Sequence, residues 1–363
     1  MTATFKTALF DSHIAAGAKI GPFAGYDMPL YYKEGVLKEH EWVRSSAGLF
    51  DVSHMGQIYL EGAGVVPFLE KITPSNFAKA GTGVAKYTVM TNESGGIVDD
   101  LIITRVNDEK FLSVINAGCK EKDIAWIIDH LPADVKLVRL DDRALIALQG
   151  PKAEQVLREV LKIDASGLGY MRMMFIDGLI ISRLGYTGED GFEISVPEDR
   201  ASDLWVKLLA SQLVKPVGLA ARDSLRLEMG YPLYGHDIND ETTPLEADLG
   251  WVMGKGNEGF IGAGNVLGKT LKRKRVGVKL TDKGIAREGA EIRNDKNKVI
   301  GALTSGGHSP TLKSSIGMGY VDAAYANPGT KIFVTVRGNN IGAEIAALPF
   351  IPARTKSSKK AAA

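Results

Sequence analysis

Apolar residues recur along this chain at two different periods, and the mixture predicts a protein with both helices and strands. The strongest helical pattern lies in residues 152–161, where Ala153, Val156, Leu157 and Val160 are separated by three, one and three positions. This spacing places all four side chains on one face of a helix. It therefore predicts an amphipathic helix packed against a core.

Further helices and strands follow from the same two periods, without a regular alternation of strand and helix. Helices are predicted over residues 36–44, 65–72, 120–131, 201–213 and 220–229. Strands are predicted over residues 57–60, 87–91, 101–105, 111–115, 180–183 and 192–196. This order indicates an α+β arrangement for residues 1–265.

The character of the sequence changes after about residue 265. Residues 267–275 are rich in lysine and predict a linker. Beyond it, five short strands are predicted, over residues 276–280, 299–304, 317–321, 331–336 and 343–347. Short strands separated by turns are typical of a small all-β barrel. Residues 276–352 are therefore expected to form a barrel domain, and residues 353–363 a flexible tail.

Length and composition narrow the class of protein. The chain has 363 residues, 45% hydrophobic and 24% charged, which excludes disorder, collagen and coiled coil for the chain as a whole. At roughly 150 residues per domain, two or three domains are expected. Lysine and arginine (44) nearly balance aspartate and glutamate (43), so no nucleic-acid partner is expected. No apolar run approaches the roughly 18 residues of a membrane span, so no membrane segment is expected.

Cysteine and histidine usage bears on redox compartment and metals. The single cysteine, Cys119, cannot form an intramolecular disulfide, and the six histidines never fall four residues apart. The sequence therefore predicts no metal site and suits a reducing compartment. The first 15 residues resemble neither a secretory signal nor a transit peptide. The expected location is the bacterial cytoplasm or an equivalent matrix.

The first candidate site is the stretch 95–101, Gly-Gly-Ile-Val-Asp-Asp-Leu. Its two glycines predict a tight turn, and Asp99 and Asp100 then open an apolar strand. Neighbouring strand residues point to opposite faces, so one aspartate is expected to face inward and the other to face solvent or cap the turn. A buried carboxylate needs a partner or a function, because burying it unpaired is costly. A turn-capping pair and a functional carboxylate both fit the local pattern.

The second candidate is the stretch 184–193, which holds three glycines, two aromatic residues and three acids. Glycines permit close backbone approach, aromatic rings offer stacking faces, and carboxylates accept hydrogen bonds from N–H groups. A planar heterocycle with amidine-like donors would suit such a set. The stretch lacks the lysine and hydroxyl of a phosphate-binding loop. A polar hairpin without function is the alternative.

The stretch 50–56 places Ser53 and His54 beside an acid, which invites comparison with a catalytic triad. No Gly-x-Ser-x-Gly motif surrounds the serine, and adjacent residues on an extended chain diverge, so the triad is rejected. His54 is interpreted as a structural histidine. Cys119, at the start of a predicted helix, is interpreted as a small buried residue rather than a nucleophile.

Residues 220–228 begin a helix in which arginines and acids alternate. One interpretation is a solvated face with pairs at i, i+4 spacing, such as Ser224 with Glu228. The other is an arginine, Arg222, whose guanidinium forks onto a ligand carboxylate.

These stretches together resemble the aminomethyltransferase (T-protein) family of the glycine cleavage system. The matching segments occur in order from about Thr7 to Pro352 and nearly fill the chain. They are residues 22–30, 50–56, 95–101, 185–193, 221–228, 234–237, 304–312 and 349–352. Several motifs in a fixed order are far more specific than any one of them.

The resemblance implies a fold and a reaction. The fold is a three-domain α+β clover-leaf around a central folate channel, with residues 1–265 forming two intertwined α+β domains and a C-terminal β-barrel following. In the reaction, a lipoylated H-protein brings an aminomethyl group on sulfur. The enzyme transfers its methylene carbon to tetrahydrofolate, releasing ammonia and giving methylene-tetrahydrofolate and dihydrolipoyl H-protein.

The resemblance also implies roles for particular residues. Asp100, the second acid of the pair, matches the family's catalytic carboxylate, which moves the interpretation of that position toward function. The positions that match the family's folate site are Glu193, Tyr186, Arg222, Tyr87, Asn116 and Met55. Arg222 is expected to bind either the glutamyl carboxylate of folate or a neighbouring acid. A late tyrosine of some relatives is missing after Pro352, so the contact made there is open.

Two alternatives keep the folate pocket but change the role. One is another folate-dependent one-carbon transferase or demethylase of the same family, and the other is a non-catalytic folate-binding module. Asp100 argues against a purely binding role, because folate can be held without it. For the H-protein, a basic run at residues 272–275 together with Arg287 is a candidate docking patch. A solvated linker is the simpler interpretation of that run.

Overall fold

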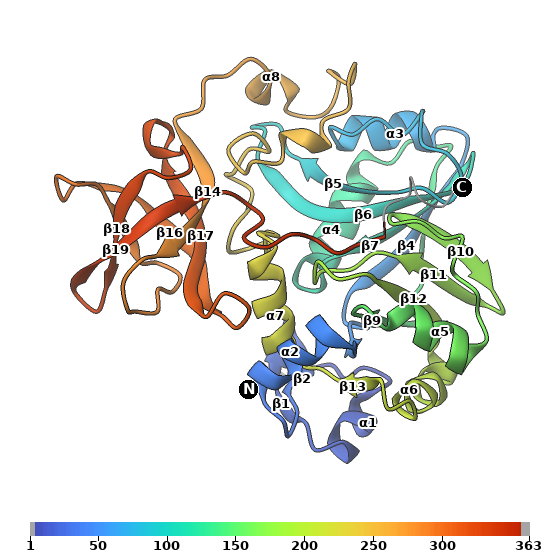
Figure 1. Cartoon of the computed structure of the whole chain (residues 1–363). Coiled ribbons are helices and arrows are strands. Elements are labelled where there is room, and N and C mark those ends of the chain that lie inside the picture. The colour runs from blue at the N-terminus through green and yellow to red at the C-terminus, as the bar shows by residue number, and fades with distance from the viewer. Residues whose placement is uncertain (1–3, 357–363) are drawn as a thin grey trace.

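The computed structural model describes residues 4–356 and contains three β-rich units around a central helix (Figure 1). The first unit is a five-stranded antiparallel sheet in the order β5-β6-β7-β4-β8. Its strands are β4 (Gly56–Glu61), β5 (Ala85–Thr91), β6 (Ile97–Asn107), β7 (Lys110–Ile115) and β8 (Lys136–Arg139). Helices α3 (Val65–Ile72) and α4 (Lys120–His130) carry residues of its core, among them Phe68, Leu69 and Ile127.

The second unit is a six-stranded sheet in the order β10-β11-β12-β9-β3-β13. Its strands are β3 (Ala47–Asp51), β9 (Arg143–Gln149), β10 (Arg172–Ile176), β11 (Leu179–Arg183), β12 (Gly191–Pro197) and β13 (Val214–Pro216). Helices α5 (Ala153–Leu161) and α6 (Ala201–Leu209) pack on it around Trp205. Because β3 precedes the first sheet in the chain and β9 follows it, the two units are interleaved.

The third unit is a closed barrel in the order β14-β17-β16-β15-β18-β19, which confirms the predicted β-barrel. Its strands are β14 (Arg273–Leu280), β15 (Glu291–Arg293), β16 (Val299–Ser309), β17 (Ser314–Asp322), β18 (Lys331–Val336) and β19 (Asn339–Ala346). Strand β14 begins at Arg273, so the last residues of the predicted linker are part of the barrel.

Helix α7 (Leu219–Glu228) lies between the barrel and the rest of the molecule (Figure 1). It contacts α2 (Val36–Ser45), the barrel strands β16 and β17, and strand β2 (Tyr26–Tyr31) of the N-terminal hairpin. The remaining elements are α1 (Phe10–Ala15), β1 (Lys19–Phe23), α8 (Ala263–Val266) and four short 3-10 helices: Ala117–Cys119, Glu198–Arg200, Gly250–Val252 and Ala323–Tyr325. Within residues 4–356, no helix is both long and apolar enough for a membrane crossing.

The segment after the barrel returns to the second unit, which corrects part of the expected tail. Arg354 Nε donates to Glu189 Oε1 at 3.1 Å, and its Nη2 donates to the carbonyl oxygen of Arg44 at 2.7 Å. Lys356 Nζ donates to Glu154 Oε2 at 3.0 Å. Residues 353–356 are thus held in place by ion pairs, whereas the rest of the expected tail, 357–363, lies outside the described residues.

Candidate active site

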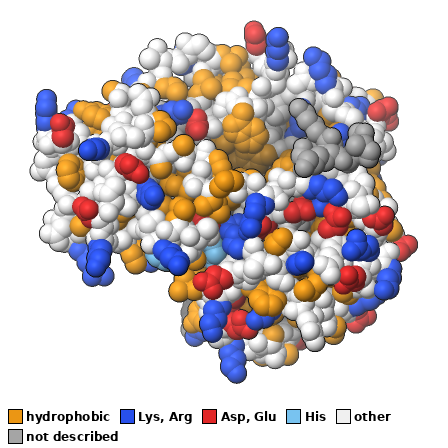
Figure 2. Space-filling model, viewed as in Figure 1, with side chains coloured by type: hydrophobic (Ala, Val, Ile, Leu, Met, Phe, Trp, Pro, Cys, Tyr) orange, Lys and Arg blue, Asp and Glu red, His pale blue; other side chains and the backbone are white. Residues whose placement is uncertain are grey.

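A cavity of about 940 Å³ lies where the three units meet. Its wall combines residues of the first sheet, the loop before β12, helix α7, the loop that follows α7, and Leu348 and Pro349 after the barrel. Figure 2 shows an apolar hollow in the region of β5 on one face of the molecule. The volume is that of a site for an organic ligand or cofactor. All seven site residues expected from the family resemblance line this one cavity: Met55, Tyr87, Asp100, Asn116, Tyr186, Glu193 and Arg222.

Asp100 lies at the start of β6, and two neighbouring side chains hold its carboxyl group. Tyr87 Oη on β5 donates to Asp100 Oδ2 at 2.9 Å, and Asn116 Nδ2 donates to Asp100 Oδ1 at 2.8 Å. Burial, with the nearby Asp99 charge as the second cause, raises the pKa of Asp100 to about 7. A carboxyl group that titrates near neutral pH suits proton transfer.

The two aspartates point to opposite faces of β6, as the strand pattern predicts, but neither faces solvent. Asp99 is fully buried and Asp100 is 9% exposed. Asp99 lies among groups of the segment 116–123: its Oδ1 accepts from Asn116 Nδ2 at 3.0 Å, and its Oδ2 accepts from the Asn116 backbone N–H at 3.3 Å. The expectation of a solvent-facing or turn-capping aspartate is therefore wrong, because chain after β7 covers that side of the strand.

The turn before β6 is capped by Asn92 instead. Asn92 Oδ1 accepts the backbone N–H of Gly96 at 2.9 Å. Gly95 adopts a positive φ of 84°, and a Cβ on Gly96 would lie 1.7 Å from the carbonyl oxygen of Asp240. Gly95 is thus required for the conformation of the turn and Gly96 for its approach to residue 240, and the turn fixes the position of Asp100 on β6.

Glu193, Arg222 and Tyr186 form a second polar group on the cavity wall. Glu193 is 7% exposed, and within residues 4–356 its carboxylate accepts no hydrogen bond. Burial raises its pKa, and the charge of Arg222 opposes that rise. The Arg222 guanidinium lies 4.9 Å from the centroid of the Tyr186 ring, and its buried Nη1 has no partner in the described chain. An acceptor and a donor are therefore left for a ligand.

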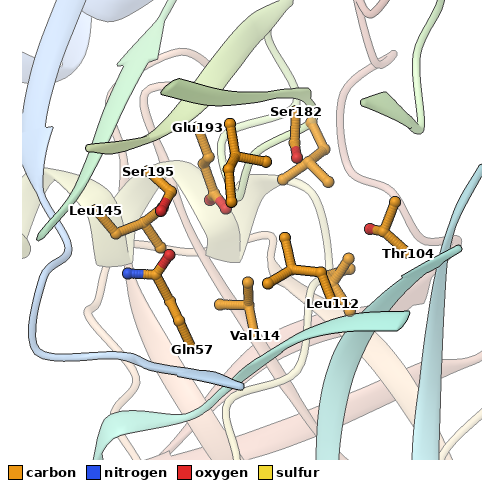
Figure 3. A pocket seen from close by; sticks show the side chains of 11 residues that line it. Gln57, Thr104, Leu112, Val114, Leu145, Ser182, Glu193 and Ser195 are labelled. Carbon is orange, nitrogen blue, oxygen red and sulfur yellow. The ribbon is translucent and has the colours of Figure 1, made fainter. Parts of the chain in front are cut away.

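Glu193 also borders a second, much smaller void of about 10 Å³ between the two sheets (Figure 3). Figure 3 shows the Glu193 carboxylate pointing toward the gap opposite Val114, with Gln57 and Ser195 to one side. Such a void has room for about one water molecule. Organic ligands can thus reach Glu193 only from the large cavity.

Helix α7, which carries Arg222, does not form the solvated face considered from the sequence. Arg226 is 3% exposed and Glu228 is fully buried. Arg226 Nη1 donates to Asp237 Oδ2 at 2.8 Å, and Arg44 Nη2 donates to Glu228 Oε2 at 2.7 Å. The i, i+4 interpretation is wrong, because α7 lies between the sheets and the barrel and these charges bond across those interfaces.

The other two acids of the stretch 184–193 are structural. Glu189 Oε1 accepts from Arg44 Nη1 at 2.9 Å, and Asp190 Oδ1 accepts from Arg183 Nε at 2.9 Å. Tyr186 Oη donates to the carbonyl oxygen of Pro232. The stretch is therefore neither a plain polar hairpin nor wholly functional: Tyr186 and Glu193 reach the cavity, and Glu189 and Asp190 hold the loop.

His54 differs from the sequence interpretation. It lines the cavity beside Met55, and its buried Nδ1 has no hydrogen-bond partner in the described chain, so it is not a satisfied structural histidine. Burial lowers its pKa to about 4. The rejected triad is also not formed in the structure, because Ser53 Oγ donates to the carbonyl oxygen of Leu145 at 3.2 Å and not to His54. Burial raises the pKa of the Cys119 thiol, which agrees with its interpretation as a non-nucleophile.

Three aromatic residues on the cavity wall were missed from the sequence. Trp251, 68% exposed, stacks on Tyr87 with ring centroids 5.5 Å apart. Tyr231 stacks on Tyr186 with centroids 5.7 Å apart, and Tyr170 lies on the same wall. Tyr170 and Tyr231 lie in irregular segments and Trp251 in the short 3-10 helix Gly250–Val252, so no periodic pattern marks them and only their aromatic character could have identified them.

The basic run at residues 272–275, considered above as a docking patch, is only partly engaged by the rest of the chain: Lys272 and Arg287 are exposed, whereas the other three residues of the run make contacts. Arg275 is 4% exposed and donates to the carbonyl oxygens of Ala247 and Gly230. Lys274 Nζ lies 3.0 Å from Asp248 Oδ1, and Arg273 Nε lies 3.2 Å from Glu246 Oε1. Arg273, Lys274 and Arg275 thus link the barrel to the preceding loop, and a docking role for the exposed residues stays a prediction.

Two family models match the chain and together cover most of it. The GCVT N-terminal domain matches residues 9–257, and the glycine cleavage T-protein C-terminal barrel domain matches residues 273–351. The second match coincides with the closed barrel of the structure.

Curated relatives and a solved structure agree with these matches. The mitochondrial aminomethyltransferase of Flaveria pringlei is 43% identical over 96% of this chain and 90% of its own length. The aminomethyltransferase of Prosthecochloris aestuarii is 43% identical over 95% of this chain and 99% of its own. The crystal structure of the glycine cleavage system aminomethyltransferase T from Bartonella henselae superimposes with a TM-score of 0.94. It is 41% identical, and the match covers 97% of this chain and 99% of that one.

Proposed function

Because the chain belongs to the aminomethyltransferase (T-protein) family of the glycine cleavage system, we propose that its substrates are a lipoylated H-protein and tetrahydrofolate. The H-protein would present an aminomethyl group bound to a lipoyl sulfur. Transfer of its methylene carbon to tetrahydrofolate would release ammonia and leave methylene-tetrahydrofolate and dihydrolipoyl H-protein.

The proposed chemistry breaks one carbon–sulfur bond and one carbon–nitrogen bond. The amine lone pair forms an iminium as sulfur leaves with the bonding electrons, and one folate nitrogen attacks the iminium carbon. A second folate nitrogen then displaces ammonia. The two N–H protons of tetrahydrofolate are taken up by the sulfur and by the ammonia. Positive charge develops at the reacting carbon and nitrogen, so a fixed carboxylate nearby stabilises the transition state.

Asp100 is the catalytic residue in this proposal. Its carboxyl group lines the cavity and is oriented by Tyr87 and Asn116. With its pKa raised to about 7, it can accept a proton from the folate nitrogen and return one to the leaving group. Exclusion of bulk water by the cavity wall strengthens its interaction with the iminium.

Glu193, Tyr186 and Arg222 would bind tetrahydrofolate. Within residues 4–356 the Glu193 carboxylate accepts no hydrogen bond, so it is free to accept two N–H donors from the aminopyrimidinone edge of the pterin. Tyr186 offers its ring as a wall, and the unpartnered Arg222 Nη1 can donate to a ligand oxygen. Met55, Tyr87 and Asn116 complete the lining on the Asp100 side.

The observation that carries this proposal is the pairing of Asp100 and the unpartnered Glu193 on the wall of one cavity of about 940 Å³. A purely folate-binding module would need the second carboxylate but not the first. We also expect the reaction to take place in the bacterial cytoplasm or an equivalent matrix, where a lone thiol such as Cys119 stays reduced.

The deciding experiment measures ammonia released from H-protein loaded with the aminomethyl group, with and without tetrahydrofolate. Rapid release that requires tetrahydrofolate, with methylene-tetrahydrofolate formed in equal amount, is the expected result. Equal rates with and without tetrahydrofolate would exclude the proposed transfer. Binding of tetrahydrofolate without any transfer would favour a folate-binding module.

A further inference from the structure

Near the two aspartates of β6 lies a third acid, Asp123, which has no role in the site described so far. Asp123, on α4, is fully buried, and neither of its carboxyl oxygens accepts a hydrogen bond within residues 4–356. Its carboxyl group lies within 4.8 Å of a carboxyl oxygen of Asp99 and of the Cys119 sulfur. A buried carboxylate in this position would be unpaired and repelled by Asp99, which is costly.

One proton resolves this conflict. Two buried carboxyl groups in contact share a proton, because both cannot be ionised at neutral pH. Burial and the adjacent carboxyl group of Asp99 raise the pKa of Asp123 to about 11. A protonated Asp123 has an O–H to donate, and Asp99 is the acceptor within reach.

Asp99 is connected to the catalytic Asp100 by hydrogen bonds through Asn116. Asp99 Oδ1 accepts from Asn116 Nδ2 at 3.0 Å, and the same amide nitrogen donates to Asp100 Oδ1 at 2.8 Å. Asp99 also accepts the backbone N–H of Asn116 at 3.3 Å. The orientation of Asn116, and through it that of Asp100, therefore depends on the Asp99 carboxyl group staying in place.

We propose that Asp123 is a positioning residue for aminomethyl transfer: as a neutral carboxylic acid it donates to Asp99, which holds the Asn116 amide that orients Asp100. This proposal rests on the function proposed above and adds a residue that does not line the cavity. With one proton between them, Asp99 and Asp123 together carry a net charge of −1, which acts on the nearby Asp100.

Other charged and titratable groups lie near the Asp99–Asp123 pair and Asp100, and they also bear on the pH dependence. Tyr87 on β5 and Asn116 after β7 bond it directly, and both bonds lower the pKa of Asp100. Tyr186, from the loop before β12, interacts electrostatically with Asp100. Lys122 and Cys119 lie beside the Asp99–Asp123 pair. Among these groups, Asp99 is the one that raises the pKa of Asp100 after burial itself.

The first test compares Asp123→Asn with Asp123→Ala. The asparagine keeps a donor for Asp99 without a proton to lose, whereas the alanine leaves Asp99 without that donor. We expect Asp123→Ala to lower kcat by ~10–100-fold, as misplacement of a reacting group does, with the dissociation constant of tetrahydrofolate little changed. Asp123→Asn should recover most of that loss. Asp129→Ala, an exposed position on the same helix, is the control for α4 itself. Equal, wild-type kcat in all three variants would overturn the proposal.

The second test uses the pH profile of kcat. In Asp123→Asn the Asp99 charge remains, so the acidic limb should stay near its wild-type position. In the double variant Asp99→Asn/Asp123→Asn the charge is gone, and the limb should move to lower pH by about 1–3 units. A limb that does not move in the double variant would show that the pair has no electrostatic role.

The third test does not depend on activity and separates this proposal from the proposed function. Difference infrared spectra of wild type against Asp123→Asn at neutral pH should show one additional C=O band of a protonated carboxylic acid in the wild type, because the partly protonated Asp100 contributes to both spectra and cancels. Since the pKa of Asp123 is raised in the folded protein, its stabilising effect is lost as pH rises, and Asp123→Asn should gain thermal stability relative to wild type between about pH 5 and about pH 9. No such band, or stoichiometric zinc held by Asp99, Cys119 and Asp123, would overturn the shared proton even if transfer activity is normal.

Discussion

Two carboxyl groups on the cavity wall differ in the number of hydrogen bonds that they accept from the protein. Asp100 keeps two, from Tyr87 and Asn116, while Glu193 has none within the described chain. A carboxyl group held by two donors is fixed in orientation and suited to catalysis. A carboxylate without donors is suited to binding a ligand that brings them.

The first prediction concerns Asp100→Asn. The amide keeps the shape of the side chain but can neither accept the proton nor stabilise the iminium. Acid–base and electrostatic contributions are each commonly worth ~10²–10⁴-fold, so kcat should fall by several hundred-fold or more. Titration should show nearly unchanged tetrahydrofolate affinity. A silent Asp100→Asn variant beside an inactive Asp99→Asn variant would mean that the two roles are reversed.

The second prediction concerns pH. Asp100 must be ionised to stabilise positive charge, and its pKa is raised to about 7, so kcat should fall as pH drops through about 7 and level off above it. The hydrogen bond from Tyr87 lowers the pKa of Asp100. Tyr87→Phe should therefore shift the acidic limb to higher pH. An acidic limb near the ordinary aspartate range in the wild type would contradict this assignment.

The third prediction separates binding from chemistry. Glu193→Gln and Arg222→Ala each remove one side of a charge-assisted contact, which should cost about 1.5–3 kcal/mol, or roughly 10–100-fold in tetrahydrofolate affinity. Fluorescence titration measures the dissociation constants. Glu198→Gln, an exposed position just beyond β12, is the matched control. Dissociation constants like that of the control would remove both residues from the site.

At the scale of elements, the longer helices could be predicted from sequence, whereas several strands could not. Helix α3 was predicted with its observed bounds, and α2, α4 and α5 to within one or two residues. The partly exposed strands β8 and β10 were missed, whereas β12, buried along all but its last residue, was predicted. Strands β3 and β9 were also missed: β3 is buried along its whole length and β9 along all but its first residue. Strands buried on both faces lose the alternation of polar and apolar residues that marks a strand. In the site, the residues that belong to motifs were predicted, whereas the aromatic residues Tyr170, Tyr231 and Trp251, which lie outside the motifs, were not.

The fourth prediction concerns the turn that positions β6. In Gly96→Ala the new Cβ would clash with the carbonyl oxygen of Asp240, which belongs to backbone and cannot rotate away. Overpacking of this kind typically costs about 1–3 kcal/mol. Urea unfolding should show that loss, together with lower kcat, because Asp100 lies on β6 four residues after Gly96. Gly167→Ala, where a Cβ meets nothing within 4 Å, should be close to wild type in both measurements.

At the scale of the whole molecule, the cavity exists because the barrel holds α7 and its following loop against the two sheets. The contact centres on a buried ion pair, in which Arg226 Nη1 on α7 donates to Asp237 Oδ2 at 2.8 Å. Arg226 Nη2 also donates to Ser305 Oγ of β16 at 2.9 Å, and Tyr320 Oη of β17 donates to the Asp237 carbonyl oxygen at 2.7 Å. Helix α7 and the loop after it thus meet two neighbouring barrel strands, β16 and β17, at Arg226 and Asp237.

The last prediction tests this junction with the two acids that share Arg226. Asp237 is fully buried, and removing it in Asp237→Ala leaves the guanidinium without its buried partner, which typically costs 3–5 kcal/mol. Asp223, whose side chain is 59% exposed, bonds Arg226 Nε at 2.8 Å, and Asp223→Ala should cost only ~0–1 kcal/mol, because water screens that pair. Chemical denaturation measures both. Since the loop from Met229 to His236 lines the cavity between α7 and Asp237, Asp237→Ala should also weaken tetrahydrofolate binding, and Asp223→Ala should not. Equal losses of stability in the two variants would show that the barrel is held by its apolar contacts alone.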